Sequence, residues 1–281
     1  MTAALDRIPN SLFRIISFVV IAILFVMIAF PLYFMVTTSF KLDSEIYSEL
    51  TWIPRNPTLV NYRDAIINFH IPLYLRNTLT VALTTTLIVV VISVLAAYSL
   101  TRLRFPGRAA MARGVLFVYL IPGSLMLIPM YLIIVKIGLK DSFPGLVVAN
   151  MSFSVPFCTW LMMGYLRTIS TEIEEASLID GCTRLLSLRH IVIPLSVPAI
   201  ITASIFIFNN VWNEYIFALV LAQDDAHKMI SVGLANFYRS DYYMVGPMMA
   251  GSLIAMTPVV ILYILAQRYV VTGLAAGAVK G

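Results

Sequence analysis

Charged residues, cysteine and histidine are all scarce in this sequence. Asp, Glu, Lys and Arg make up 12% of its 281 residues, about half the share in ordinary soluble domains. Hydrophobic residues make up 60%, which excludes a water-soluble globule. The two cysteines fall in a predicted membrane span and in a loop, so no disulfide is expected. There are only three histidines, and His227 lacks a partner at metal-ligand spacing, so no metal site is expected either.

The uncharged residues gather into six stretches, each 22 to 26 residues long. About 20 apolar residues in a helix are enough to cross a hydrocarbon core of roughly 30 Å. The sequence therefore predicts an all-α integral membrane protein with one transmembrane domain over 1–281. Composition alone leaves a pore, a carrier, a membrane enzyme or a receptor open. The predicted spans are at about 15–40, 77–101, 114–135, 142–166, 191–222 and 242–267.

Positive charge is shared unevenly among the segments that join these spans. The segments 1–14, 102–113, 167–190 and 268–281 carry 11 Lys and Arg against five acidic residues, whereas 41–76, 136–141 and 224–241 carry eight of each. Lys and Arg are retained on the cytoplasmic side of membranes. We therefore expect a multi-pass membrane protein with both termini in the cytoplasm. The basic composition then reflects topology and indicates no nucleic-acid partner.

Prolines interrupt the third predicted span. Pro122, Gly123 and Pro129 lie inside it, so we expect this helix to be kinked or broken. Broken helices at membrane depth often line a cavity, because the freed backbone groups need partners that lipid does not supply. A proline tolerated through its neighbours is the equal alternative.

The segment 167–194 differs most from a passive connector between two spans. Thr171 and Glu174 fit a capping box, with Thr171 as N-cap, so a short helix should begin there. Gly181 stands where a left-handed residue would end that helix. A second apolar segment leads on to Pro194 at the start of the fifth span. The pattern predicts a helix-turn-helix on the cytoplasmic surface.

Polar residues at the end of the fifth span are candidates for the path of a solute. Amide, carboxylate and aromatic groups suit sugar hydroxyls and the apolar faces of sugar rings. An ionisable group at membrane depth, here Glu214, marks a cavity or a partner. Hydrogen bonding between spans and contact with an external binding protein are equally open explanations. The candidates are Asn209, Asn210, Trp212, Asn213, Glu214 and Tyr215.

The run Glu175-Ala176-Ser177-Leu178-Ile179-Asp180-Gly181, followed thirteen residues later by Pro194, resembles the EAA loop of ABC-importer membrane subunits. The family pattern is Glu-Ala-Ala, two residues, Asp-Gly-Ala and later Ile-x-Leu-Pro. The chain departs from this pattern at Ser177, Cys182 and Ile193, all small or apolar exchanges that are compatible with a docking helix.

The resemblance extends over nearly the whole chain and points to the carbohydrate-importer permeases, in particular the maltose-type subunit with six spans. The motifs that carry it are Trp52-Ile53-Pro54 with Pro57-Thr58-Leu59 and Asn61-Tyr62, Ala96-Ala97-Tyr98-Ser99-Leu100, Arg104-Phe105-Pro106-Gly107, Trp212-Asn213-Glu214 and the C-terminal run 273–281. Their order along the chain makes chance agreement improbable.

The resemblance implies a transport subunit that is not itself an enzyme. The chain lacks the phosphate-binding pattern G-x-x-x-x-G-K-[ST], so ATP and Mg²⁺ would bind to partner ATPases, and no cofactor is expected here. A cytoplasmic EAA coupling helix between spans 4 and 5 would dock in an ATPase groove; a merely solvated surface helix is the alternative. The residues implied in coupling are Glu174, Glu175, Ala176, Ser177, Asp180, Gly181 and Pro194.

The partners that the family implies are a paralogous permease, two cytoplasmic ATPases and an extracytoplasmic solute-binding protein in a prokaryotic cell membrane. The expected activity is ATP-driven import of a mono-, di- or oligosaccharide by alternating access, with the sugar held mainly by the paralogous permease. Import of glycerol phosphate or another polyol-like solute is an alternative. A secondary carrier is a further alternative, although it would need more coupling charges inside the spans than Glu214 alone.

Overall fold

The computed structural model describes residues 10–48, 50–238 and 244–278, with side chains over 13–48, 50–238 and 244–267. The described residues form helices joined by turns, without a strand element among them. The chain divides into two compact units, Met1–Phe69 with Asn236–Ile254 and His70–Ala235 with Ala255–Gly281. Residues 242 and 243 of the predicted sixth span, and residues 279–281 of the C-terminal motif, lie outside the described residues.

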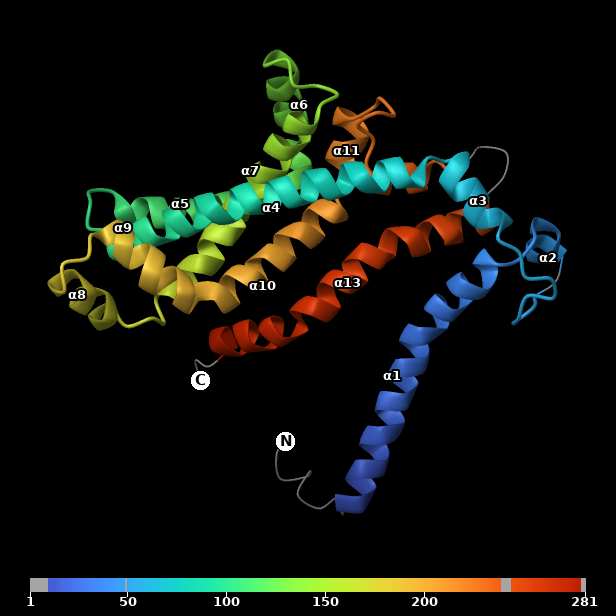
Figure 1. Cartoon of the computed structure of the whole chain (residues 1–281), viewed down its shortest axis with the longest axis horizontal. Helices are drawn as coiled ribbons and strands as arrows, with labels where there is room; N and C mark the ends of the chain where they lie inside the picture. The colour runs from blue at the N-terminus through green and yellow to red at the C-terminus, as the bar shows by residue number, and fades with distance from the viewer. Residues whose placement is uncertain (1–9, 49, 239–243, 279–281) are drawn as a thin grey trace. The chain divides into compact units, whose positions relative to one another are not determined.

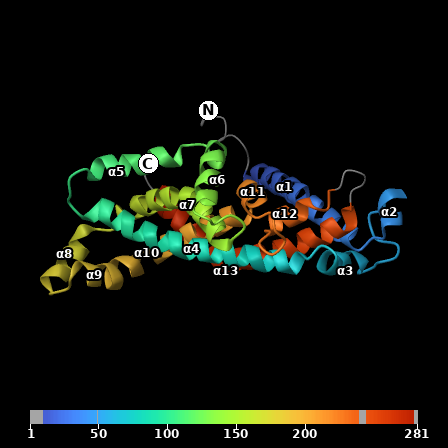
Figure 2. The ribbon, with the colours of Figure 1, turned by 90° about the horizontal axis from the view of Figure 1, so that it is seen from above.

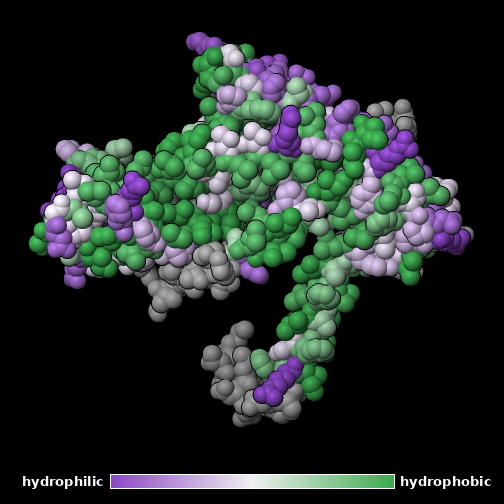
Figure 3. Space-filling model, in the orientation of Figure 1, coloured by the Kyte–Doolittle hydropathy of each residue, from purple (hydrophilic) through white to green (hydrophobic). Residues whose placement is uncertain are grey.

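The first unit contains α1 (Asn10–Ser39), α2 (Asp43–Ser48), α3 (Val60–Ile67) and the beginning of α13 (Val245–Ala278). No residue in the most apolar window of α1 is buried, and the exposed surface of this helix is largely apolar (Figure 3). The helix therefore offers its side chains to lipid or to another chain.

The segment between α1 and α3 folds back on the end of α1. The Tyr33 hydroxyl donates a hydrogen bond to the carbonyl of Trp52 over 2.8 Å. The buried Asn61 amide donates to the carbonyls of Ser39 and Lys41 over 3.0 and 2.7 Å. The bond to Ser39 satisfies a carbonyl in the last turn of α1, where a helix leaves such groups without intrahelical partners.

The second unit is built around three long helices that pack side by side, α4, α7 and α10 (Figures 1 and 2). Small buried residues such as Ala97, Ala149 and Ala203 allow the helices to approach closely, as is typical of membrane proteins. The elements are α4 (Ile71–Arg102), α5 (Arg108–Tyr119), η2 (Gly123–Met126), α6 (Leu127–Lys136), α7 (Phe143–Leu166), α8 (Thr171–Ile179), α9 (Arg184–Ser187), the π-helical η3 (Leu188–Val192), α10 (Ile193–Trp212), α11 (Ile216–Leu221), α12 (Ile230–Ala235) and the remainder of α13.

Among the described residues, five helical segments are long and apolar enough to cross a membrane, and there are six if a bent pair is counted as one span. The bent pair is the third predicted span, in which α5 and the η2–α6 segment meet at 94°. Pro122 and Gly123 lie at the bend, so the predicted break is confirmed. In Figures 1 and 2, α6 runs across the direction of α5.

The predicted fifth span, 191–222, is not one continuous helix. Helix α10 ends at Trp212, and α11 begins at Ile216. The cause is the side chain of Glu214, whose two oxygens accept hydrogen bonds from the backbone N–H groups of Phe217 and Ala218 over 2.7 and 2.8 Å. A carboxylate at this position caps the N-terminus of a new helix, so the helix restarts.

Candidate functional site

Helix α8 begins one residue earlier than the sequence predicted. Its N-cap is Ser170, whose hydroxyl accepts a hydrogen bond from the N–H of Glu172 over 3.2 Å. The predicted capping box of Thr171 and Glu174 is therefore wrong. The reason is that the carboxylate of Glu174 turns inward to other partners and does not return to the start of its own helix.

The predicted end of α8 at Gly181 is confirmed. Gly181 has a φ of +91°, in the left-handed region that favours glycine. Its N–H donates to the carbonyl of Leu178 over 3.2 Å, and the N–H of Cys182 donates to that of Ser177 over 3.0 Å. This pair of bonds is a Schellman motif, which satisfies the last carbonyls of the helix.

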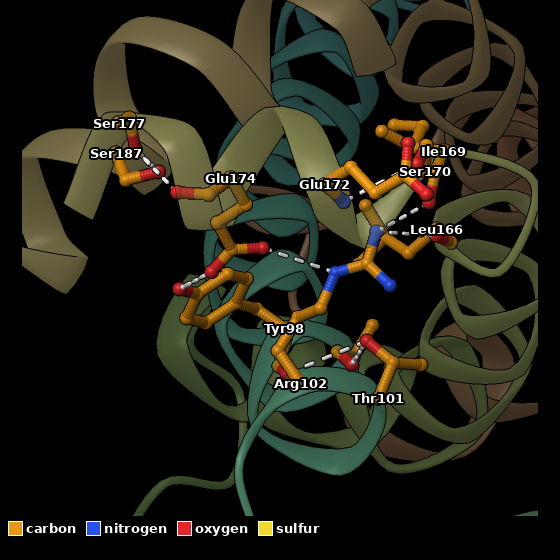
Figure 4. Close-up of polar contacts among 11 residues, drawn as sticks. Tyr98, Thr101, Arg102, Leu166, Ile169, Ser170, Glu172, Glu174, Ser177 and Ser187 are labelled. Carbon is orange, nitrogen blue, oxygen red and sulfur yellow. Dashed lines mark hydrogen bonds and ion pairs between the residues drawn. The ribbon is translucent and has the colours of Figure 1, made fainter. Parts of the chain in front are cut away.

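Glu174 is buried, with only 5% of the residue exposed. The Tyr98 hydroxyl donates a hydrogen bond to one carboxylate oxygen. The Nε of Arg102 lies 3.1 Å from the other oxygen and forms an ion pair with it. Figure 4 shows both contacts between α8 and the end of α4. We call Tyr98, Arg102 and Glu174 the anchor cluster.

Arg102 also reaches the end of α7. One of its terminal nitrogens donates to the carbonyls of Leu166 and Ile169 over 2.9 and 2.8 Å. Leu166 is the last residue of α7, and Ile169 lies in the turn that follows it, where helix geometry leaves carbonyls short of intrahelical partners. The anchor cluster therefore joins α8 to α4 and α7. The buried Arg102 guanidinium forms an ion pair with Glu174 and hydrogen bonds with two backbone carbonyls.

Ser177 holds α8 to α9. Its hydroxyl is buried, donates to the carbonyl of Glu174 over 2.7 Å and shares a hydrogen bond of 2.8 Å with the hydroxyl of Ser187. Small hydroxyl side chains at both positions allow the two helices to meet closely. Ser177 is thus part of the packing within the helix pair, and its side chain is not on the outer face.

The outer face of the α8–α9 pair carries the other residues implied in coupling. Glu175, Ala176, Asp180 and Gly181 are all exposed. Around them lie apolar side chains that are equally exposed, among them Ile179 at 86% and Leu185 at 71%. An exposed apolar surface of this kind marks a contact with another protein or with a membrane.

The helix pair continues directly into α10. Residues Arg184–Trp212 form one helical segment of 29 residues, with a π-helical turn at Leu188–Val192. Pro194 is exposed and occupies the second position of α10. Because proline lacks an N–H group, it interrupts the regular hydrogen-bond ladder here, where the π turn ends. Movement of α9 would therefore pass into α10 along a continuous backbone.

The candidate path residues separate into buried and exposed groups. Trp212 is buried and stacks on Phe208 with ring centroids 5.3 Å apart. Glu214 caps α11. Asn210, Asn213 and Tyr215 are exposed, and the Asn213 amide donates to the carbonyl of Asn209 over 2.8 Å and to its side-chain oxygen over 3.1 Å.

The sequence did not indicate a second polar contact, at the opposite end of α4. The buried Asn77 amide donates to the carbonyls of Ala226 and Lys228, both over 3.0 Å. The Thr78 hydroxyl accepts from the N–H of Ile230 over 2.8 Å. The loop that they hold, 223–229, carries Asp225, whose pKa is lowered chiefly by its hydrogen bond from Lys228. We call Asn77 and Thr78 the loop clamp.

Within the described part of the chain, no group of three or more His, Cys, Asp or Glu residues is placed to hold a metal ion. The polar side chains described above in residues 167–194 are instead bonded to other side chains of this chain or exposed. Their arrangement suits a mechanical role, in which one face of a helix pair is fixed to the membrane helices and the other face is available.

Comparison with known proteins gives the family. The sequence pattern of the binding-protein-dependent transport system inner membrane component matches residues 89–275. The sulfoquinovosyl glycerol transport system permease protein SmoH of Agrobacterium fabrum is 34% identical over 95% of this chain and 94% of that protein. The diacetylchitobiose uptake system permease protein DasC of Streptomyces coelicolor is 32% identical over 97% of this chain and 99% of that protein.

A solved structure shares the fold. A chain from the crystal structure of a bacterial ABC transporter, described as involved in the import of the acidic polysaccharide alginate, matches with a TM-score of 0.83 and 22% identity, over 93% of this chain and 98% of that chain. The protein belongs to the family of binding-protein-dependent transport system inner membrane components. It is a multi-pass ABC importer permease, and the predicted all-α membrane fold is confirmed.

Proposed function

We propose that this chain is one of two permease subunits of an ATP-driven sugar importer, and that the outer face of α8 and α9 receives the motion of the ATPases. The observation that carries the proposal is the division of this helix pair. Polar Glu174 and Ser177 are buried, whereas apolar Ile179 and Leu185 are exposed. This arrangement suits a helix pair whose apolar face is covered by another protein.

A sugar is the solute that the relatives favour. SmoH is named for the transport of sulfoquinovosyl glycerol and DasC for the uptake of diacetylchitobiose, and both solutes carry sugar rings. The motifs shared with carbohydrate permeases run from Trp52 to the C-terminal end of the chain. The proposed substrate is therefore a mono-, di- or oligosaccharide.

The coupling residues take different roles in this proposal. Glu175, Ala176, Asp180 and Gly181 lie on the exposed face and would contact the ATPase directly. Burying one exposed isoleucine such as Ile179 stabilises a contact by about 1.5–3 kcal/mol. Pro194 marks the point where α10 takes over the movement of the helix pair.

The solute path would use the exposed polar residues near the end of α10. Asn210, Asn213 and Tyr215 are exposed and would contact the sugar in this proposal. Trp212 and Glu214 are assigned instead to packing and to the cap of α11. Alternating access would then move α10 as one rod, with the sugar shared between this chain and the paralogous permease.

The assembly contains one paralogous permease, two ATPases that bind ATP and Mg²⁺, and an extracytoplasmic binding protein. Because α8 and α9 would meet cytoplasmic ATPases, both termini lie in the cytoplasm. The excess of Lys and Arg in the same set of segments supports this orientation. The proposed location is a prokaryotic cell membrane.

Proteoliposomes with the complete complex test the proposal. We expect sugar uptake only with ATP and the binding protein present, and we expect Ile179→Glu to abolish both uptake and copurification of the ATPases. Ile53→Glu is the matched control, because Ile53 is a similarly exposed isoleucine in the first unit, between α2 and α3. ATP-independent uptake by this chain alone would refute the importer. Full ATPase binding by Ile179→Glu would refute the docking face.

A further inference from the structure

The anchor cluster gives the coupling helix a second connection to the membrane helices. The first connection is covalent and runs from α9 through η3 into α10. The second is non-covalent, because Glu174 on α8 contacts Tyr98 and Arg102 on α4. Both connections lie in the second unit, and only the non-covalent one can be removed without altering the backbone.

Helix α4 connects the anchor cluster with the loop clamp. It is one unbroken helix from Ile71 to Arg102, and Asn77 and Tyr98 are about 30 Å apart along it at 1.5 Å per residue. The clamp at its beginning holds the loop 223–229 and the N–H of Ile230. Polar bonds therefore fix both ends of α4. The C-terminal end is bonded to α8, and the N-terminal end is bonded to the loop 223–229.

The contacts along the middle of α4 are of a different kind. The Ser93 hydroxyl donates one hydrogen bond to the Val155 carbonyl on α7 over 3.3 Å, but α7 and α10 meet α4 mainly through small or apolar buried side chains, such as Ala82 and Val89. Such contacts have little directional preference, so packed helices slide past each other over small distances at low cost. A buried ion pair with hydrogen bonds has a defined geometry, and it resists sliding at the end of α4.

We propose that Tyr98 and Arg102 are positioning residues for energy coupling, which make α4 follow α8 and so transmit ATPase movement to the loop at the other end of α4. The proposal assigns Glu174 to this connection and not to the ATPase contact. It rests on the proposed function, since it needs an ATPase that moves α8. Arg102 contributes twice, because it pairs with Glu174 and also holds the end of α7.

The experiment uses the complete complex in proteoliposomes and measures sugar imported per ATP hydrolysed, with ATPase copurification as the second readout. We expect Arg102→Gln and Glu174→Gln to retain the ATPases but to lower the sugar-to-ATP ratio about fivefold or more, the lower end of typical coupling between sites. Arg102→Lys keeps the charge and should recover part of the ratio. Tyr98→Phe removes one hydroxyl and should give an intermediate loss.

Two exposed residues near the anchor cluster in sequence provide matched controls, Arg104 just after α4 and Glu172 on α8. Arg104→Gln and Glu172→Gln remove a like charge from exposed positions, and both should keep the wild-type ratio. Tyr98→Phe decides the question if the charge variants do not assemble, because it leaves the ion pair in place. A wild-type ratio in Tyr98→Phe and in every assembled charge variant overturns the proposal, as does loss of ATPase copurification in an assembled variant. Failure of the wild-type complex to import sugar would instead refute the proposed function.

Discussion

Gly181 meets two requirements at the end of α8 that can be tested separately. The residue must adopt a positive φ, and it must leave free space on the proposed docking face. A Cβ atom added at Gly181 would meet no other atom of the chain within 4 Å, so the chain itself has room for a side chain. The φ of +91° is the only internal obstacle. For most L residues this conformation costs about 1–2 kcal/mol, whereas Asn tolerates it at a smaller cost.

The two requirements give different results for Gly181→Ala and Gly181→Asn. We expect Gly181→Ala to destabilise the end of α8 by about 1 kcal/mol, since alanine strains the Schellman motif. Gly181→Asn should keep most of that stability. Both should lower ATPase copurification and sugar uptake, because each places a side chain on the docking face beside Asp180. Thermal denaturation and copurification with the ATPases measure the two effects separately.

Gly138 supplies the control. It also has a positive φ, +76°, and open space around an added Cβ, but it follows α6 and lies away from the coupling segment in the sequence. Gly138→Ala should lose similar stability without loss of ATPase binding. Wild-type uptake and ATPase binding in Gly181→Asn would refute the reasoning, because only the backbone conformation of Gly181 would then matter.

Two further predictions concern the second unit. Glu214→Ala should destabilise the complex by about 0.5–2 kcal/mol in thermal denaturation, because the cap of α11 is lost. The selectivity among competing sugars should not change. Altered selectivity at unchanged stability would contradict the capping role. Gly145→Ala should destabilise by about 1–3 kcal/mol, because its Cβ would overlap the Leu139 carbonyl. Gly164→Ala on the same helix has open space and should be neutral or stabilising by up to about 1 kcal/mol, so equal losses would contradict the steric argument.

The membrane fold was largely predictable, because hydropathy and the positions of proline and glycine act locally. The break at Pro122 and the end of α8 at Gly181 both follow from backbone preferences of single residues. The break after Trp212 was missed because the carboxylate of Glu214 bonds to N–H groups three and four residues later. The apolar residues on both sides of Glu214 do not indicate that its side chain bonds to the backbone and ends the helix.

The position of helix α8 was predictable from the sequence, but its orientation was not. The family pattern located the helix, yet it placed Glu174 and Ser177 together with Glu175 and Asp180 as one set. Which face of α8 turns inward depends on Tyr98, Arg102 and Ser187, and two of these are about 75 residues distant in sequence. One signal was available, since Tyr98 and Arg102 are four residues apart and share a helix face at the end of a span.

Helix α8 buries two polar residues and exposes two isoleucines beside its exposed polar residues, and this distribution connects the docking face with the anchor cluster. Its buried positions are Glu174 and Ser177, whereas Ile173 and Ile179 are exposed. Apolar burial within the chain therefore contributes little to holding α8, and polar bonds must fix it in place. Directional bonds also fix the rotation of the helix, which apolar packing would leave less defined. The same inward bonds that replace a hydrophobic contact therefore keep the apolar side chains turned outward, toward the proposed ATPase.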